Sequence, residues 1–68
     1  MSELPEVRLA TDIARQFRHL GLEAGSAAVA NHITRFWDPR MRAALLDFVH
    51  GGGADLDPLV VAAADRLR

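Results

Sequence analysis

The chain has 68 residues and no cysteine, and eight basic residues, all arginine, stand against nine acidic ones to give a formal net charge of −1. This near-neutral balance argues against a dedicated nucleic-acid-binding protein, which is normally basic. The longest apolar run, from Leu59 to Ala64, is far shorter than the roughly 20 residues that a membrane-spanning helix needs.

The segment from Pro5 to Leu20 has the periodicity of an amphipathic helix, with arginines and other polar residues opposite its apolar face. That apolar face consists of Leu9, Ala10, Ile13, Phe17 and Leu20. Proline suits the first position of a helix and glycine commonly follows the last, so Pro5 and Gly21 set the predicted bounds.

A second helix is predicted to end at Trp37, because a residue that precedes proline, here Asp38, is driven to extended backbone. Its start is predicted at about Glu23 or at Ser26, since Ser26 is a suitable N-cap and Gly25 a possible break. One face carries Val29, Ala30, Ile33, Phe36 and Trp37.

Two Asp-Pro pairs, at 38–39 and 57–58, predict the starts of a third and a fourth helix, because Asp is a good N-cap and Pro a good first residue. Three glycines at 51–53 end the third helix. The expected buried residues are Met41, Leu45, Phe48 and Val49 in the third helix and Leu59, Val60, Ala63, Ala64 and Leu67 in the fourth. No alternating strand pattern occurs, so the sequence predicts an all-α fold, a single domain over residues 1–68 built as a small bundle of about four short helices.

Few residues are placed for catalysis or metal binding. A serine nucleophile needs a base beside it, and neither Ser2 nor Ser26 has a histidine at helical spacing on its own segment. The histidines His19, His32 and His50 lie on three different predicted helices, so no two of them share a helix face as metal ligands. We therefore expect no catalytic, cofactor-binding or metal-binding residue and no self-contained enzyme.

The corner between the second and third predicted helices is the part of the sequence most indicative of binding. Phe36 and Trp37 are predicted to fill the core there. Arg40 and Arg42 lie in the first turns of a helix, where the helix dipole disfavours a cation by about 0.3–1 kcal/mol, and Arg35 lies on the preceding helix. Because arginine and tryptophan are enriched at binding hot spots, we interpret the corner as an anchor for an acidic partner surface, with solvated surface charges as the alternative.

The fourth predicted helix is apolar around most of its circumference, since Val61 and Ala62 lie off its main face. Exposure of single apolar residues is common, and the alternative is a face docked on a larger protein or in a homodimer. The candidate partner-binding residues are Arg35, Trp37, Arg40, Arg42 and Val61.

The run from Ala30 to Arg42 resembles the signature of the delta subunit of NAD-dependent, molybdenum-containing formate dehydrogenase. The likeness continues through Leu45, residues 50–53 and residues 56–60, and it includes the opening segment 7–10, so that it covers nearly the whole chain. The heptapeptide Phe-Trp-Asp-Pro-Arg-Met-Arg is its specific part.

This resemblance implies a non-catalytic accessory subunit of a cytoplasmic bacterial complex that oxidises formate to carbon dioxide and reduces NAD. The larger subunits of such complexes carry a molybdenum cofactor, iron–sulfur clusters and FMN, and the delta subunit is associated with assembly or stability of the active complex. The implied partners are the larger formate dehydrogenase subunits, or a second copy in a homodimer when the chain is isolated, and neither nucleic acid nor a membrane. No cofactor is expected on this chain, and its acidic N-terminus lacks the apolar core of a secretion signal, as a cytoplasmic protein would.

Two other functions stay open from the residues alone. One is a nucleic-acid-binding module that uses Arg35, Arg40 and Arg42 against phosphates, for which binding would weaken steeply with salt. The other is a small self-associating helical protein, for which sedimentation would depend on concentration.

Overall fold

The computed structural model describes residues 4–52 and 55–67. Its elements are α1 (Pro5–Phe17), a short 3-10 turn η1 (Arg18–Leu20), α2 (Gly21–Phe36), α3 (Pro39–His50) and α4 (Pro58–Leu67). The described residues include no strand, and the predicted all-α fold is confirmed.

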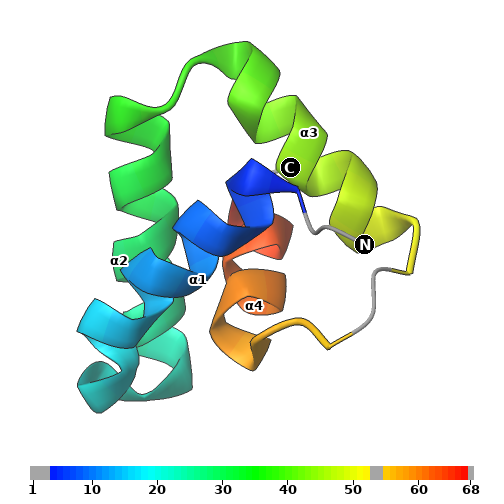
Figure 1. The fold of residues 1–68 in the computed structure, drawn as a ribbon. Coiled ribbons are helices and arrows are strands. Elements are labelled where there is room, and N and C mark those ends of the chain that lie inside the picture. Colours follow the sequence, from blue (N-terminus) through cyan, green and yellow to red (C-terminus); the bar gives the residue numbers. More distant parts are fainter. Residues whose placement is uncertain (1–3, 53–54, 68) are drawn as a thin grey trace.

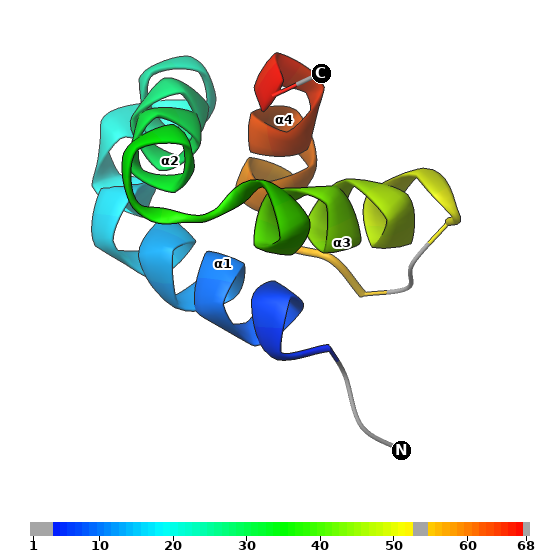
Figure 2. The same cartoon turned by 90° about the horizontal axis from the view of Figure 1, so that it is seen from above.

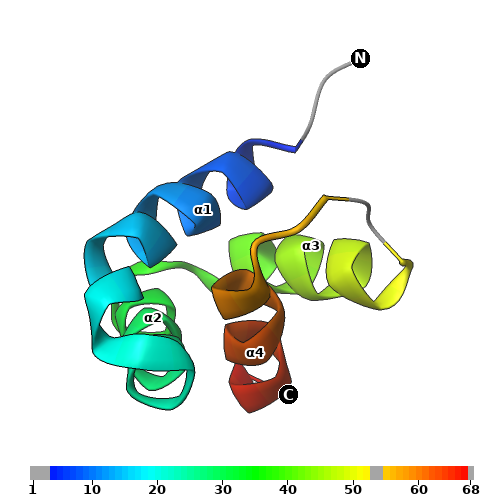
Figure 3. The ribbon, with the colours of Figure 1, turned by 90° about the horizontal axis from the view of Figure 1, so that it is seen from below.

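Helices α2 and α4 lie side by side, and α1 packs across the two of them (Figures 2 and 3). The chain turns sharply at the end of α2, and α3 then packs against α1 and α4 (Figure 1). The end of α2 that leads into this turn extends beyond α1 and α4.

The core lies where the four helices meet, and each of them contributes to it. Its buried apolar residues are Val7, Ala10, Ile13, Ala14, Val29, Ala30, Ile33, Trp37, Leu45, Leu59, Val60, Ala63 and Ala64. The predicted buried face of α4 is confirmed, with Leu67 half-buried at its end. In α3 only Leu45 is fully buried, while Met41, Phe48 and Val49 pack against the core from its margin.

The buried face of α1 differs from the predicted one. Ala10 and Ile13 are buried as expected, but Leu9 and Leu20 are each 45% exposed, and Val7 and Ala14 face the core in their place. On a helical wheel Leu9 lies about 100° from the centre of the buried arc. Ala10 and Ala14 are fully buried while the larger Leu9 is exposed, so residue size did not decide which side of the helix is buried.

The start of α2 also differs from the prediction. The helix begins at Gly21, whose φ of 87° redirects the chain straight from η1 into α2. Ser26 is not an N-cap but lies inside the helix, 2% exposed. Its Oγ donates a hydrogen bond to the carbonyl oxygen of Glu23 at 3.1 Å and accepts one from Arg66 Nε at 3.0 Å. The serine hydroxyl therefore ties α2 to the end of α4.

Both predicted Asp caps are confirmed. The amide of Met41 donates to Asp38 Oδ1 at 2.9 Å at the start of α3, and the amide of Leu59 donates to Asp57 Oδ1 at 2.9 Å at the start of α4. The second carboxylate oxygen of Asp57 forms an ion pair with Arg18 of η1, so this residue also joins the beginning of α4 to the end of α1.

We expect Asp57→Ala to lower the free energy of unfolding by about 0.5–3 kcal/mol, because it removes a cap worth about 0.5–2 kcal/mol and a half-exposed ion pair worth up to about 1 kcal/mol. Asp57→Asn keeps a capping oxygen and loses only the charge, so it should lose clearly less. Denaturant unfolding of both variants measures the difference. Equal losses would show that the ion pair, and not the cap, stabilises this junction.

Candidate protein-binding surface

Phe36 and Trp37, the two consecutive aromatic residues where α2 ends, differ in burial: Phe36 is exposed and Trp37 is buried. We call residues 35–42 the arginine corner. The amide of Trp37 donates to the carbonyl oxygen of Ile33 at 2.9 Å, which closes the last turn of α2, and its backbone is extended. The Trp37 side chain is 9% exposed and belongs to the core, as predicted. Its predicted role in partner binding stays a prediction, since a partner would reach little of the ring.

Phe36 does not fill the core, and the prediction that it does so is wrong. Its side chain is 69% exposed, more than any other large apolar residue in the described part of the chain. Phe36 is the last residue of α2, at the end that extends beyond α1 and α4 (Figure 1), and the adjacent Trp37 belongs to the core in its place.

The Phe36 ring is held against two side chains of its own helix. The rings of His32 and Phe36 have centroids 4.7 Å apart and are tilted by 43°. The guanidinium carbon of Arg35 lies 5.9 Å from the Phe36 centroid, within the range of a cation–π interaction. A sequence signal for this arrangement exists, because His32 lies one turn before Phe36 on the same face and puts a polar residue where a buried face would need an apolar one.

The arginines of the corner carry positive charge that nearby carboxylates do not neutralise. Arg35 and Arg40 are exposed and Arg42 is half-buried. Among residues 4–52 and 55–67 none of the three forms an ion pair, whereas Arg18 does. The carboxylate of Asp38, the acidic residue of the corner, is engaged as the cap of α3.

The charge of the corner is opposite to that of the rest of the chain. Residues 35–42 hold three arginines and one aspartate, whereas the remaining residues hold five arginines and eight acidic side chains. Asp38, Pro39 and Arg40 also line an open hollow of about 520 Å³ at the surface of the corner. The corner is therefore a cationic, partly apolar surface on an otherwise acidic molecule.

Four of the five predicted partner-binding residues belong to this one corner. Val61 belongs instead to α4, where it is 37% exposed. Phe36, which was expected in the core, is the exposed aromatic residue of the corner.

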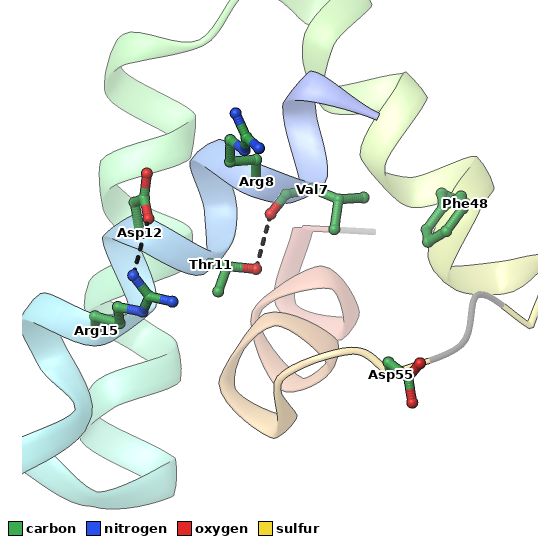
Figure 4. A pocket seen from close by; sticks show the side chains of 7 residues that line it. All are labelled: Val7, Arg8, Thr11, Asp12, Arg15, Phe48 and Asp55. Atoms are coloured by element: carbon green, nitrogen blue, oxygen red, sulfur yellow. Dashed lines mark hydrogen bonds and ion pairs between the residues drawn. The ribbon is translucent and has the colours of Figure 1, made fainter. Parts of the chain in front are cut away.

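A second depression, of about 570 Å³, lies between α1, α3 and the segment that leads into α4 (Figure 4). Val7 and Phe48 face it, while its other lining residues are polar: Arg8, Thr11, Asp12, Arg15 and Asp55. Ligand pockets are lined mainly by apolar and aromatic side chains, with a few polar groups that fix orientation. Here Asp12 pairs with Arg15 at 3.5 Å and the Thr11 hydroxyl donates to the carbonyl oxygen of Val7 at 2.8 Å, so three of the five polar side chains are already engaged within α1.

The other residues considered for chemistry are dispersed. His19 lies in η1, His32 against Phe36 in α2, and His50 at the end of α3. In the described ranges no group of three or more histidine and acidic side chains is arranged to hold a metal ion. None of the helices in these ranges has both the length and the apolar character needed to cross a membrane.

Residues 7–64 match the model of a family described as NADH-dependent formate dehydrogenase delta subunit FdsD. The matched range includes all of α2 and α3, the arginine corner, and most of α1 and α4. No curated protein and no solved structure matched the chain.

Proposed function

Since the chain belongs to the family of NADH-dependent formate dehydrogenase delta subunits, we propose that it is a non-catalytic accessory subunit that binds the larger subunits of such a dehydrogenase and supports their assembly or stability. The observation that carries this proposal is the family match over residues 7–64, which covers the corner as well as the helices that form the core. Formate oxidation and NAD reduction would take place on the larger subunits, which would hold the molybdenum cofactor, iron–sulfur clusters and FMN. The complex would act in the cytoplasm of a bacterium.

The roles of individual side chains support an accessory function. The Ser26 hydroxyl and the Arg66 guanidinium are engaged with each other in joining α2 to α4. The side chains of the corner that are available to other molecules are an exposed phenylalanine and arginines that form no ion pair within the described part of the chain. Aromatic residues and arginine are enriched at protein–protein interfaces, whereas catalysis requires a nucleophile, base or metal in a defined mutual geometry.

The proposal is tested by deleting the gene in its native host. We expect a severalfold lower yield of active formate dehydrogenase in the deletion strain, because the larger subunits would assemble less efficiently or be less stable, and recovery when the gene is supplied on a plasmid. The purified chain alone should not reduce NAD with formate. Formate-dependent NAD reduction in extracts, normalised to total protein, measures the effect, and unchanged activity in the deletion strain would contradict the proposal.

A further inference from the structure

We propose that Phe36 is the anchor by which this chain docks on a larger dehydrogenase subunit, with its ring in an apolar pocket of that subunit and with carboxylates of the pocket rim facing Arg35 and Arg40. This inference rests on the proposed function and specifies the contact through which it operates. The occupant of the surface is thus a protein of stated chemistry: an apolar recess with an acidic border.

The exposed ring of Phe36 is available to a partner and gains stability when it is buried. A phenylalanine ring that is 69% exposed leaves apolar surface in water, and covering it with a partner is favourable. Large aromatic side chains that enter a pocket dominate the energetics of many interfaces, while the surrounding contacts mainly exclude water. Phe36 is the most exposed large apolar side chain in the described ranges, and it is the last residue of α2, at the end that extends beyond α1 and α4 (Figure 1).

The Phe36 ring is already packed against side chains of its own helix before a partner binds. Contact with His32 at 4.7 Å between ring centroids and with Arg35 at 5.9 Å limits the conformations of the ring before a partner arrives. A side chain that is already ordered loses less conformational entropy on binding. The same Arg35 guanidinium places a positive charge beside the ring, so a carboxylate on the rim of the pocket would form an ion pair with it when the ring enters the pocket.

The charge distribution identifies the chemistry of the pocket rim. Phe36 and Arg40 are four residues apart, so their Cα atoms are separated by at most about 14 Å, and Arg35 is adjacent. Because the rest of the chain holds eight acidic residues against five arginines, an acidic partner is attracted by this corner and, on balance, repelled by the remainder of the chain. Complementary charge of this kind orients a partner and raises the association rate.

A second copy of the chain fits this surface poorly. In a two-fold dimer the same patch of both copies is in contact, so a dimer formed through Phe36 would bring the unpaired arginines of both copies together. A nucleic acid would meet the acidic remainder of the chain beside the corner. An acidic protein surface with an apolar recess can bury the Phe36 ring and pair with the arginines of the corner.

The first test compares two exposed apolar residues at opposite ends of α2. Tagged full-length chains carrying Phe36→Ala or Leu22→Ala are expressed in the deletion strain, and the dehydrogenase subunits that co-purify are quantified by mass spectrometry against the parent chain. Leu22 is the matched control, because its side chain is 59% exposed. We expect Phe36→Ala to recover about one-tenth or less of the parental amount and Leu22→Ala to recover nearly all of it.

The second test compares two charge reversals of equal size near helix starts. The two variants are Arg40→Glu, in the first turn of α3, and Arg8→Glu, near the start of α1. Both arginines are exposed, and neither forms an ion pair among the described residues. We expect Arg40→Glu to reduce recovery severalfold at low salt, with the difference from the parent shrinking as salt rises, and Arg8→Glu to have little effect. Both variants should melt within about 4 °C of the parent, as should Phe36→Ala.

The outcomes of these tests distinguish failure of the proposed function from failure of the Phe36 anchor. A parent chain that recovers no dehydrogenase subunit would overturn both the proposed function and the anchor. Parental recovery that Phe36→Ala leaves unchanged, or that Leu22→Ala lowers equally, would overturn the anchor alone. So would a Phe36→Ala chain that is unfolded, since the ring would then serve the fold. If sedimentation shows that the isolated parent is a dimer and Phe36→Ala a monomer, or if the corner binds nucleic acid at physiological salt, the anchor is likewise overturned.

Discussion

Trp37→Ala is expected to lower the free energy of unfolding by about 3–5 kcal/mol and to leave much of the chain unfolded at room temperature. Trp37 lies between α2 and α3 in the chain, and its indole is 9% exposed and part of the core, so its removal leaves a cavity there. A chain of this length has a total stability of roughly 3–10 kcal/mol at 0.05–0.15 kcal/mol per residue. One such cavity therefore removes about a third or more of the available stability, and all of it at the lower end of this range.

Phe36→Ala is the matched control for this substitution, because it removes an aromatic ring from the adjacent position where the ring is 69% exposed. It should change the free energy of unfolding by no more than about 0.5 kcal/mol. Trp37→Phe keeps a ring in the core and should lose less than Trp37→Ala. Urea unfolding followed by circular dichroism measures all three variants, and similar midpoints for Trp37→Ala and Phe36→Ala would show that the two rings do not differ in their contribution to the fold.

The parts of the fold that follow from neighbouring residues were predictable. An Asp-Pro pair carries its own cap and its own backbone restriction, so the starts of α3 and α4 at Pro39 and Pro58 follow from two residues each. The all-α class follows equally from local periodicity. The faces of α4 were also predictable, because its apolar residues Leu59, Val60, Ala63 and Ala64 form a wide arc that any packing would bury.

The features that depend on distant parts of the chain were not predictable. Phe36 and Trp37 are consecutive apolar residues at a helix end, and helical periodicity assigns both to one face. Which ring enters the core depends on where α2 extends past α1 and α4 and on the direction of the turn into α3. Ser26 was mistaken for an N-cap because its partner, Arg66, lies 40 residues away along the chain. The local sequence around a residue gives no information about such a pair.

The candidate surface was predicted in part for the same reason. The positions of Arg35, Arg40 and Arg42 near helix ends follow from local rules, and none of them forms an ion pair among the described residues. Their role in partner binding stays a prediction. The aromatic member was misassigned, since exposure is a property of the packed molecule. The cost of cations at a helix start, which the fold does not require, was the sequence feature that pointed to the corner.

Gly25 shows how packing can reverse the effect that local propensity predicts. The sequence indicates a break in the helix, yet Gly25 lies within α2 and is buried. A Cβ atom at this position would lie 2.9 Å from the carbonyl oxygen of Phe17 and 3.0 Å from Leu59 Cδ2. The glycine therefore lets α2 approach both the end of α1 and the first turn of α4.

We expect Gly25→Val to lower the free energy of unfolding by about 3 kcal/mol or more, at the upper end of the range for overpacked cores, because the backbone carbonyl of Phe17 cannot move aside as a flexible side chain can. Gly25→Ala should lose less, since alanine favours a helix over glycine by about 1 kcal/mol and offsets part of the clash. Ala24→Val is the matched control: it adds the same branched side chain at an exposed neighbouring position of α2, where only a propensity cost of about 0.7 kcal/mol or less applies. Thermal and urea unfolding of the three variants distinguish the two effects. If Gly25→Val is as stable as Ala24→Val, the close approach of α1, α2 and α4 at this glycine does not constrain the fold; if Gly25→Ala is more stable than the parent, helix propensity outweighs the contact with Phe17 and Leu59.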